Sequence, residues 1–273
     1  MRYAVVGHVE WIEFLRVRAV PRPGEIVHAS ASWQEPGGGG GVAAVQMARM
    51  AGEAVFFTAL GDDELGRRAC RELEALGVTM QVAWRPEPQR RGVTYVDDQG
   101  ERTITVIGPR LGPKGEDPLD WSLLESCQAV YFTAGDRDAL LHARKARVLA
   151  STPRVLSQLS GVELDALIGS ANDDGERFQP EALDPRPRLA VLTEGGAGGS
   201  WSTSDGRRGR FAACPLPGPV ADAYGCGDTF AAALTFALGQ GLTLERALEH
   251  AARQGAICLT GKGPYSARVT GLN

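Results

Sequence analysis

The sequence predicts an α/β fold in which a layered sheet carries a second, smaller sheet as a lid. Short apolar segments alternate with helical segments along most of the chain, as they do when helices join the strands of a sheet. Two pairs of extended segments are too polar for the centre of a parallel sheet, and two long helical segments close the chain. A chain of 273 residues can bury a large core, so we expect a single domain over residues 1–273.

The first half of the chain supplies the opening strand and the lid. An apolar strand over residues 2–7 ends in glycine. The lid strands are expected within about 11–33 and 90–108, because each region holds two extended segments joined by a turn, at Pro21–Gly24 and at Asp97–Gly100. We expect one face of this lid to carry Val93, Tyr95, Ile104 and Val106. Such a face packs over a substrate or pairs with a second subunit.

The remaining segments build the layered part. A helix is expected over 42–51, a strand over 54–60, and then a helix that Asp62 caps and Gly77 ends. Later strands are expected at 129–133, 147–150, 166–171 and 189–193. The apolar run from Phe230 to Leu238 predicts a buried helix, with Asp228 where it begins.

Composition narrows the class of protein. With 43% hydrophobic residues and a formal charge of -4, the chain is globular and offers no electrostatic reason for a nucleic-acid partner. The five cysteines form no C-x-x-C pair, which argues against a disulfide framework or a zinc site and for a reducing compartment. The N-terminal segment carries His8, Glu10 and Glu13, so we do not expect it to act as a signal peptide, and the sequence holds no 18-residue apolar run. We expect a cytoplasmic protein with a small-molecule substrate and no membrane partner. The local basic cluster of Arg207, Arg208 and Arg210 is expected to be a solvated hairpin tip.

Three glycine clusters stand out: "PGGGGG" at 36–41, "TEGGAGG" at 193–199 and "GCGD" at 225–228. None is a phosphate-binding P-loop, because no Gly-Lys-Ser/Thr follows, and none has the context of a dinucleotide fingerprint. Asp228 in the last cluster has two interpretations. It is either an N-cap, which a helix start favours on its own, or a functional carboxylate.

In this order and at these distances the motifs resemble the ribokinase/PfkB family of carbohydrate kinases over nearly the whole chain. The resemblance is carried by "GGGGVAAVQMARMAGEAVFFTALGDDELG", "TEGGAG", "DAYGCGDTF" and "HAARQGAICLTGKG". It implies a ribokinase-like three-layer α/β/α sandwich with a small β-sheet lid. It also implies a phosphotransferase that moves the γ-phosphoryl group of ATP to a hydroxyl of a sugar or sugar-like acceptor.

The resemblance assigns roles that physical chemistry can explain. Asp228 would accept the proton of the attacking hydroxyl, while the N–H groups of Gly225, Cys226 and Gly227 would hold the charge on the γ-phosphoryl oxygens. This shifts the interpretation of Asp228 from a mere cap to a base, and it can serve as both. The nucleotide would be lined by Thr193, Gly195, Gly198, Gly225 and Gly227, and the acceptor by Gly38, Gly40 and Asp228.

The implied cofactors are ATP with Mg²⁺, and K⁺ as a monovalent cation. Mg²⁺ bridges phosphates as a hard dication. The family's N-x-x-E motif is altered here, because Asn172 matches but Glu176 comes one residue late, so this region is either a metal site or a solvated acidic turn. Asp222 and the backbone near Tyr224 match the monovalent-cation position. Cys226 replaces the usual alanine, and a small buried side chain explains it better than a reactive thiolate.

The acceptor side departs furthest from the family. Ile12 and Val42 stand where an acceptor-gripping Asp and Asn are usual. Two outcomes are open. In an ordinary sugar kinase, Glu10 or Glu13 hydrogen-bonds the acceptor hydroxyls in place of the usual Asp. Alternatively, an apolar pocket accepts a nucleoside or heterocyclic alcohol, on which Trp11 or Trp33 could stack. A non-catalytic nucleotide- or metabolite-binding relative is the rival function. The resemblance further implies a homodimer formed through the lid.

Overall fold

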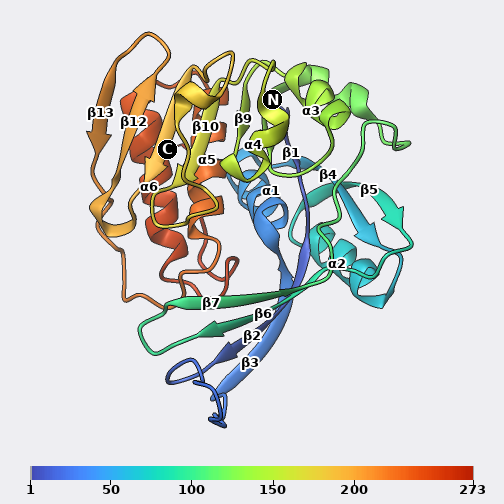
Figure 1. The fold of residues 1–273 in the computed structure, drawn as a ribbon, viewed down its shortest axis with the longest axis vertical. Coiled ribbons are helices and arrows are strands. Elements are labelled where there is room, and N and C mark those ends of the chain that lie inside the picture. The colour runs from blue at the N-terminus through green and yellow to red at the C-terminus, as the bar shows by residue number, and fades with distance from the viewer. Residues whose placement is uncertain (1, 273) are drawn as a thin grey trace.

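A nine-stranded sheet forms the centre of the molecule, in the order β13-β12-β11-β10-β9-β8-β1-β4-β5 (Figure 1). The computed structural model describes residues 2–272. The strands from β5 to β11 are parallel, and β12 and β13 form an antiparallel edge. The strands of this sheet are β1 (Arg2–Val6), β4 (Ala54–Gly61), β5 (Val78–Arg85), β8 (Cys127–Phe132), β9 (Leu149–Ser151), β10 (Ala166–Ser170), β11 (Leu189–Thr193), β12 (Gly199–Thr203) and β13 (Arg208–Phe211).

Helices cover both faces of this sheet, which explains why its central strands are continuous apolar runs rather than alternating ones. On one face pack α1 (Gly38–Ala51), α2 (Glu64–Ala75), α5 (Cys226–Gly239) and α6 (Leu244–Cys258), and on the other α3 (Arg137–Arg144) and α4 (Leu156–Leu159). Short 3₁₀ turns lie at Trp121–Ser126, Pro153–Val155, Pro180–Ala182 and Gly195–Ala197. The expected three-layer α/β/α sandwich is confirmed.

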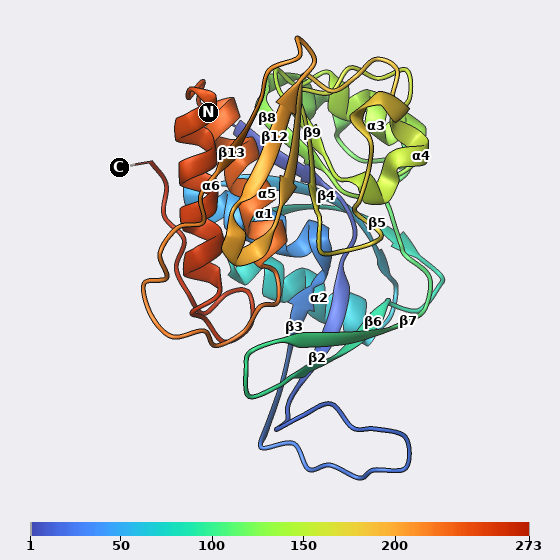
Figure 2. The same ribbon diagram turned by 60° about the vertical axis from the view of Figure 1, so that its left-hand side comes forward.

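A second sheet of four strands stands away from this body as the predicted lid (Figure 2). Its order is β3-β2-β6-β7, with β2 (Glu10–Arg16), β3 (Ala31–Gly37), β6 (Arg91–Val96) and β7 (Arg102–Ile107). The long connection between β2 and β3 forms the far tip of the lid in Figure 2. The lid joins the body at its other end, where only residues 7–9 separate β1 from β2 and no residue separates β3 from α1.

The expectation that Val93, Tyr95, Ile104 and Val106 share one lid face is wrong. In the antiparallel register Val93 opposes Thr105 and Thr94 opposes Ile104, and opposing residues share a face. Val93 and Tyr95 therefore lie on the outer face. Ile104 and Val106 share a face with Phe14, which packs against Tyr224 of the body, so they face inward.

Several predicted boundaries also shift. Helix α1 begins at Gly38 rather than residue 42, because the glycine run itself is helical. Asp63 rather than Asp62 caps α2, its Oδ1 accepting the N–H of Gly66 at 2.8 Å. Strand β5, an edge strand with a mixed burial pattern, was not predicted from the sequence.

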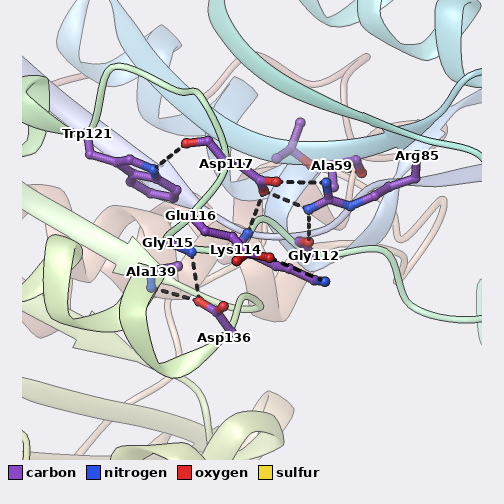
Figure 3. Close-up of polar contacts among 11 residues, drawn as sticks. Ala59, Arg85, Gly112, Lys114, Gly115, Glu116, Asp117, Trp121, Asp136 and Ala139 are labelled. Atoms are coloured by element: carbon purple, nitrogen blue, oxygen red, sulfur yellow. Dashed lines mark hydrogen bonds and ion pairs between the residues drawn. The ribbon is translucent and has the colours of Figure 1, made fainter.

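The segment that leads from the lid back to β8 is tied to the body by Asp117 (Figure 3). Its carboxylate accepts both arms of the Arg85 guanidinium, at 2.7 and 2.6 Å, and the N–H of Lys114 at 2.6 Å. Its carbonyl accepts the indole N–H of Trp121 at 3.1 Å. The return segment is therefore held firmly where it leaves the lid.

Within the described residues, none of the helices has the length and apolar character that a membrane span requires.

Candidate active site

Asp228 lies in the first turn of α5. Gly225 is the N-cap with φ +77°, a left-handed conformation that favours glycine, and Cys226, Gly227 and Asp228 are the first helical residues. Their N–H groups point out of the helix end without intrahelical partners. Thr229 donates to the Gly225 carbonyl at 2.8 Å, whereas no hydrogen bond reaches the Asp228 carboxylate within residues 2–272. The carboxylate therefore does not cap its own helix here.

The first glycine cluster brings a second helix end against this carboxylate. A Cβ atom on Gly39, in the first turn of α1, would lie 2.9 Å from Asp228 Oδ1. The N–H of Gly38 donates to the Tyr224 hydroxyl at 2.9 Å, which joins the two segments. Two helix N-termini thus converge on one carboxylate, and such ends stabilise negative charge on a ligand.

The environment of Asp228 raises its pKa to about 6. Burial of the carboxyl group is the main cause and the negative charge of Glu176 is the second, while Arg102 and Arg154 oppose the shift. A carboxylate with this pKa is ionised at neutral pH but is a stronger base than a surface aspartate. It suits the removal of a proton from a hydroxyl.

Glu10 supplies a carboxylate on the acceptor side. It is only 8% exposed at the start of β2. Its Oε1 accepts the Nε–H of Arg90 at 2.6 Å and lies 3.7 Å from Nε2 of His8. The ion pair neutralises Glu10 and leaves its second oxygen available to a ligand.

The other predicted acceptor residues are placed differently. Glu13 points to solvent, whereas Ile12 and Val42 are fully buried in the core. Gly38 and Gly40 lie in the first turn of α1 against the backbone and side chain of His8. The structure therefore gathers Glu10, Gly38 and Gly40 around Asp228, with Ile12 and Val42 packed beneath them.

The predicted nucleotide loop is the tight turn between β11 and β12. Thr193 ends β11, and its hydroxyl donates to the Gly169 carbonyl at 3.4 Å. The N–H of Glu194 donates to the Gly198 carbonyl at 2.7 Å, which closes the turn over Gly195. A Cβ on Gly195 would lie 3.6 Å from the Asn172 amide, so the two predicted motifs are neighbours.

The acidic turn that follows β10 is paired with an arginine. Arg154 donates to Glu176 Oε1 at 2.8 Å and also to Asp173. Among residues 2–272 no group of three His, Cys, Asp or Glu side chains is arranged to hold a metal ion by itself. Glu176 is nevertheless close enough to Asp228 to raise its pKa, so one carboxylate of the altered motif faces the predicted reaction site.

Asp222 holds two loops together below the start of α5. It is fully buried, and its oxygens accept the N–H groups of Tyr224 at 2.8 Å and Gly263 at 3.0 Å. Burial raises its pKa. A carboxylate oxygen accepts more than one contact, so a monovalent cation remains compatible with this position.

The thiol of Cys226 donates to the Asp222 carbonyl at 3.9 Å. A hydrogen bond with the Cys258 thiol and burial raise the pKa of Cys226 well above its usual value. This agrees with the interpretation of Cys226 as a small side chain rather than a reactive thiolate.

Four polar residues near the site were missed from the sequence: His8, Arg90, Arg110 and Arg154. Burial is the main cause that lowers the pKa of His8, and the positive charges of all three arginines lower it further. His8 could have been found as the first polar residue after the glycine that ends the opening strand. Arg90 and Arg110 flank the predicted second lid hairpin, but only its pairing register shows that they meet.

Fold and site together define a small-molecule kinase with a lid. The model of the pfkB family of carbohydrate kinases matches residues 2–160 and 158–270. The chain therefore belongs to this family, and it is a phosphotransferase that uses an alcohol group as acceptor.

Individual relatives agree with this assignment. The ATP-dependent ribose-1-phosphate kinase of Halopiger xanaduensis is 28% identical, over 98% of this chain and 95% of that protein. A ribokinase structure from Giardia lamblia has a TM-score of 0.80 at 17% identity, covering 98% and 96% of the two chains. An adenosine kinase structure from Sinorhizobium meliloti has a TM-score of 0.76 at 19% identity, covering 96% and 94%. The two structures show that this chain has the same fold as these kinases, and the family match shows that it is a kinase of the ribokinase/PfkB type.

The raised pKa of Asp228 predicts an acidic limb in the pH profile. We expect kcat/KM to fall as the pH is lowered through about 6, because protonated Asp228 cannot accept the hydroxyl proton. Steady-state rates across pH 5–9 measure it, with thermal midpoints at each pH as the control for unfolding. A rate that stays constant down to pH 5 would contradict the assignment.

The close contact of Gly39 with Asp228 predicts that Gly39→Ala lowers kcat without unfolding the protein. The new methyl group would displace the carboxylate, and a misplacement of about 1 Å can cost roughly 10²-fold in rate. Helix propensity changes in favour of alanine, so the thermal midpoint should not fall. Gly218→Ala, where a Cβ meets only Thr260 at 3.8 Å, is the matched control. Equal rates for both variants would refute the contact's importance.

Proposed function

We propose that this enzyme transfers the γ-phosphoryl group of ATP to a hydroxyl of a sugar or sugar-like acceptor. The hydroxyl oxygen bonds to the γ-phosphorus while the bond from that phosphorus to the bridging β–γ oxygen breaks. Asp228 takes the hydroxyl proton and ADP leaves. One observation carries this proposal: the Asp228 carboxylate, which has no hydrogen-bond partner among residues 2–272, lies between two helix N-termini.

The helix ends support the transfer electrostatically. We propose that the N–H groups of Gly225, Cys226 and Gly227, which lie at the start of α5 directly before Asp228, hold the charge that the γ-phosphoryl oxygens would gain. The base and the anion-binding groups belong to one turn of α5, so their relative positions do not depend on loop motion. We propose that Thr193, Gly195 and Gly198 line the nucleotide at the neighbouring turn.

We propose that Mg²⁺ accompanies ATP, with Glu176 and Asn172 as the residues nearest to it. The acidic turn lacks a complete protein ligand set, which fits an ion held mainly by phosphates and water. When bound, Mg²⁺ would neutralise phosphate charge. Arg154, already paired with Glu176, adds a fixed positive charge on that side. The Asp222 and Tyr224 position is proposed for K⁺.

The acceptor is proposed to lie between Asp228, Glu10 and the inner face of the lid. The second carboxylate oxygen of Glu10 can accept a hydrogen bond from a sugar hydroxyl. This supports a sugar acceptor that Glu10 binds in place of the usual Asp. Ile104 and Val106 are 40% and 42% exposed on that inner face, which favours a nucleoside as the second candidate. From the name of the Halopiger relative, ribose 1-phosphate is a third acceptor to test.

We propose that the whole chain acts as one kinase domain in the cytoplasm. All five cysteines are free thiols, including the neighbouring Cys226 and Cys258 at the start of α5 and the end of α6. Neighbouring buried thiols persist best in a reducing compartment.

The base assignment predicts that Asp228→Asn abolishes phosphoryl transfer while ATP binding survives. Loss of a general base costs about 10²- to 10⁴-fold in rate. The folded protein holds Asp228 with a pKa of about 6 instead of 3.8, so ionisation destabilises the fold as the pH rises between these values. Asparagine removes this cost, and the thermal midpoint at pH 7 should hold or rise.

Coupled ADP-release assays and calorimetric titration of ATP test this variant. A rate within about threefold of the wild type would sink the base assignment, because that range lies far below the expected loss. Loss of ATP binding along with activity would instead point to a structural role for Asp228.

We also propose a homodimer through the outer face of the lid. Leu15, Val93 and Tyr95 share this face and are only partly buried, and an apolar face of this kind is stabilised by a second copy. Light scattering at micromolar concentration should give twice the chain mass of 29.0 kDa. Tyr95→Lys should shift the particle toward the monomer, and a wild-type mass near 29.0 kDa would exclude the dimer.

A further inference from the structure

Two buried tyrosines of the body reach the residues where the lid strand β3 passes into α1. Tyr265 follows α6, and its hydroxyl donates to the carbonyl of Pro36 at 2.7 Å. Tyr224 precedes α5, and its hydroxyl accepts the N–H of Gly38 at 2.9 Å. Both side chains are less than a tenth exposed, and burial raises the pKa of both hydroxyls well above its usual value, so they stay protonated. One hydroxyl therefore holds the residue before Gly37, and the other holds the residue after it.

Gly37 itself lies against one of these hydroxyls. A Cβ atom at this position would be 2.5 Å from the Tyr224 hydroxyl oxygen and 2.8 Å from Ile12 Cγ1. No side chain fits between the junction and the hydroxyl, so the tyrosine touches the backbone directly. The ring of Tyr224 also meets Phe14 of lid strand β2 edge-on, with ring centroids 4.9 Å apart. A single side chain of the body thus contacts both β2 and β3.

The segment that carries Tyr265 is fixed to α1. Two side chains of this helix bind it: Gln46 donates to the carbonyl of Pro264 at 2.6 Å, and Arg49 donates to the carbonyl of Tyr265 at 2.7 Å. Because the Tyr265 hydroxyl reaches Pro36 on the lid side, this segment bridges the junction from the helix to the strand. It therefore restricts the angle between β3 and α1.

Asp222 joins the two tyrosines to the start of α5. Its carboxylate accepts the N–H groups of Tyr224 and Gly263, so it holds both segments on which the tyrosines lie. Asp228 follows Tyr224 by only four residues. The two hydroxyls and the proposed base therefore belong to one hydrogen-bonded part of the body, and the lid junction is attached to it.

We propose that the hydroxyls of Tyr224 and Tyr265 are positioning groups for phosphoryl transfer, which hold the junction of lid and body at the angle that places Gly39 against Asp228. This rests on the proposed function. Gly39 is the next residue after the held Gly38, and a Cβ atom on it would lie 2.9 Å from Asp228 Oδ1. Without these two hydroxyls, the hydroxyl clamp, the lid would turn about the junction and move the groups beside the base. The clamp acts through the backbone and takes no part in the transfer itself.

Removal of one hydroxyl at a time tests the proposal. Tyr265→Phe keeps the ring and removes only the hydrogen bond to Pro36. With the fastest acceptor among ribose, fructose, adenosine and ribose 1-phosphate, we expect the acceptor KM to rise about 2- to 10-fold, the range that one hydrogen bond supplies. We expect kcat to fall by up to about 10²-fold, because Gly39 and Asp228 lose their alignment. The KM of ATP should stay constant, because the turn after β11 that is proposed to line the nucleotide lies outside the junction.

Tyr3→Phe is the matched control. Tyr3 is fully buried and packs against Gly239 at the far end of α5, away from the junction. This substitution should leave kcat and both KM values unchanged. Wild-type kinetics for Tyr265→Phe and Tyr224→Phe would overturn the proposal. An equal rise of both KM values with a lower thermal midpoint would also overturn it, since the tyrosines would then have a merely structural role.

Amide hydrogen exchange tests the clamp without any substrate. Gly38 is the first residue of α1, so its N–H has no partner within the helix and depends on the Tyr224 hydroxyl for protection. Tyr224→Phe should raise the exchange rate in peptides over residues 34–42 about 2- to 10-fold, while peptides from α6 keep theirs. Faster exchange without turnover of any acceptor would keep the clamp and overturn the proposed reaction. Unchanged exchange would overturn the clamp and leave the kinase assignment standing.

Discussion

The contact between the first turn of α1 and the carboxylate of Asp228 is the constraint on which the rest of the site depends. A carboxylate can face a helix start this closely only where the facing residue lacks a side chain, and Gly39 meets that need. The approach brings the first turns of α1 and α5 to one place. It also places His8 and Glu10, which follow β1, within reach of the same space.

Charge balance follows from this geometry. Burial is the main cause of the raised pKa of Asp228, and the negative charges of Glu176 and Glu10 are close enough to raise it further. Arginines from three separate elements offset these negative charges. Asp228 alone has no direct ion pair among the described residues, so it keeps the elevated pKa. The ion pairs therefore balance the charges of Glu10 and Glu176, while Asp228 keeps the higher proton affinity that its proposed role as base requires.

Much of the fold was predictable, because local patterns determine it. Periodic apolar runs predicted the body, and turn residues predicted the lid hairpins. The face assignment in β7 failed because one residue of register moves every side chain to the other face, and register is set by pairing rather than by local sequence. The start of α1 was predicted too late in the sequence, because a run of glycines favours a loop by propensity. In the structure this run is helical and packs against Asp228 and His8.

The site was predictable only where its residues are contiguous. Asp228 and its glycines occupy one turn, so a motif reveals them. Arg90, Arg110 and Arg154 follow one another at intervals of 20 and 44 positions in the sequence and come together through sheet pairing and the order of strands. Nothing in their immediate neighbours distinguishes them from surface arginines. Site residues that stand alone and far apart in the sequence are therefore missed by predictions from local sequence patterns.

The direct passage of β3 into α1 has a mechanical meaning. No loop lies between Gly37 at the end of the lid strand and Gly38 at the start of the helix, and Gly38 has φ +78°. A rotation of the lid about its root must be absorbed by the torsion angles of these residues, because the elements on either side are rigid. The same torsions set where Gly39 meets Asp228. The torsion angles of Gly37 and Gly38 thus couple the angle of the lid to the space beside Asp228.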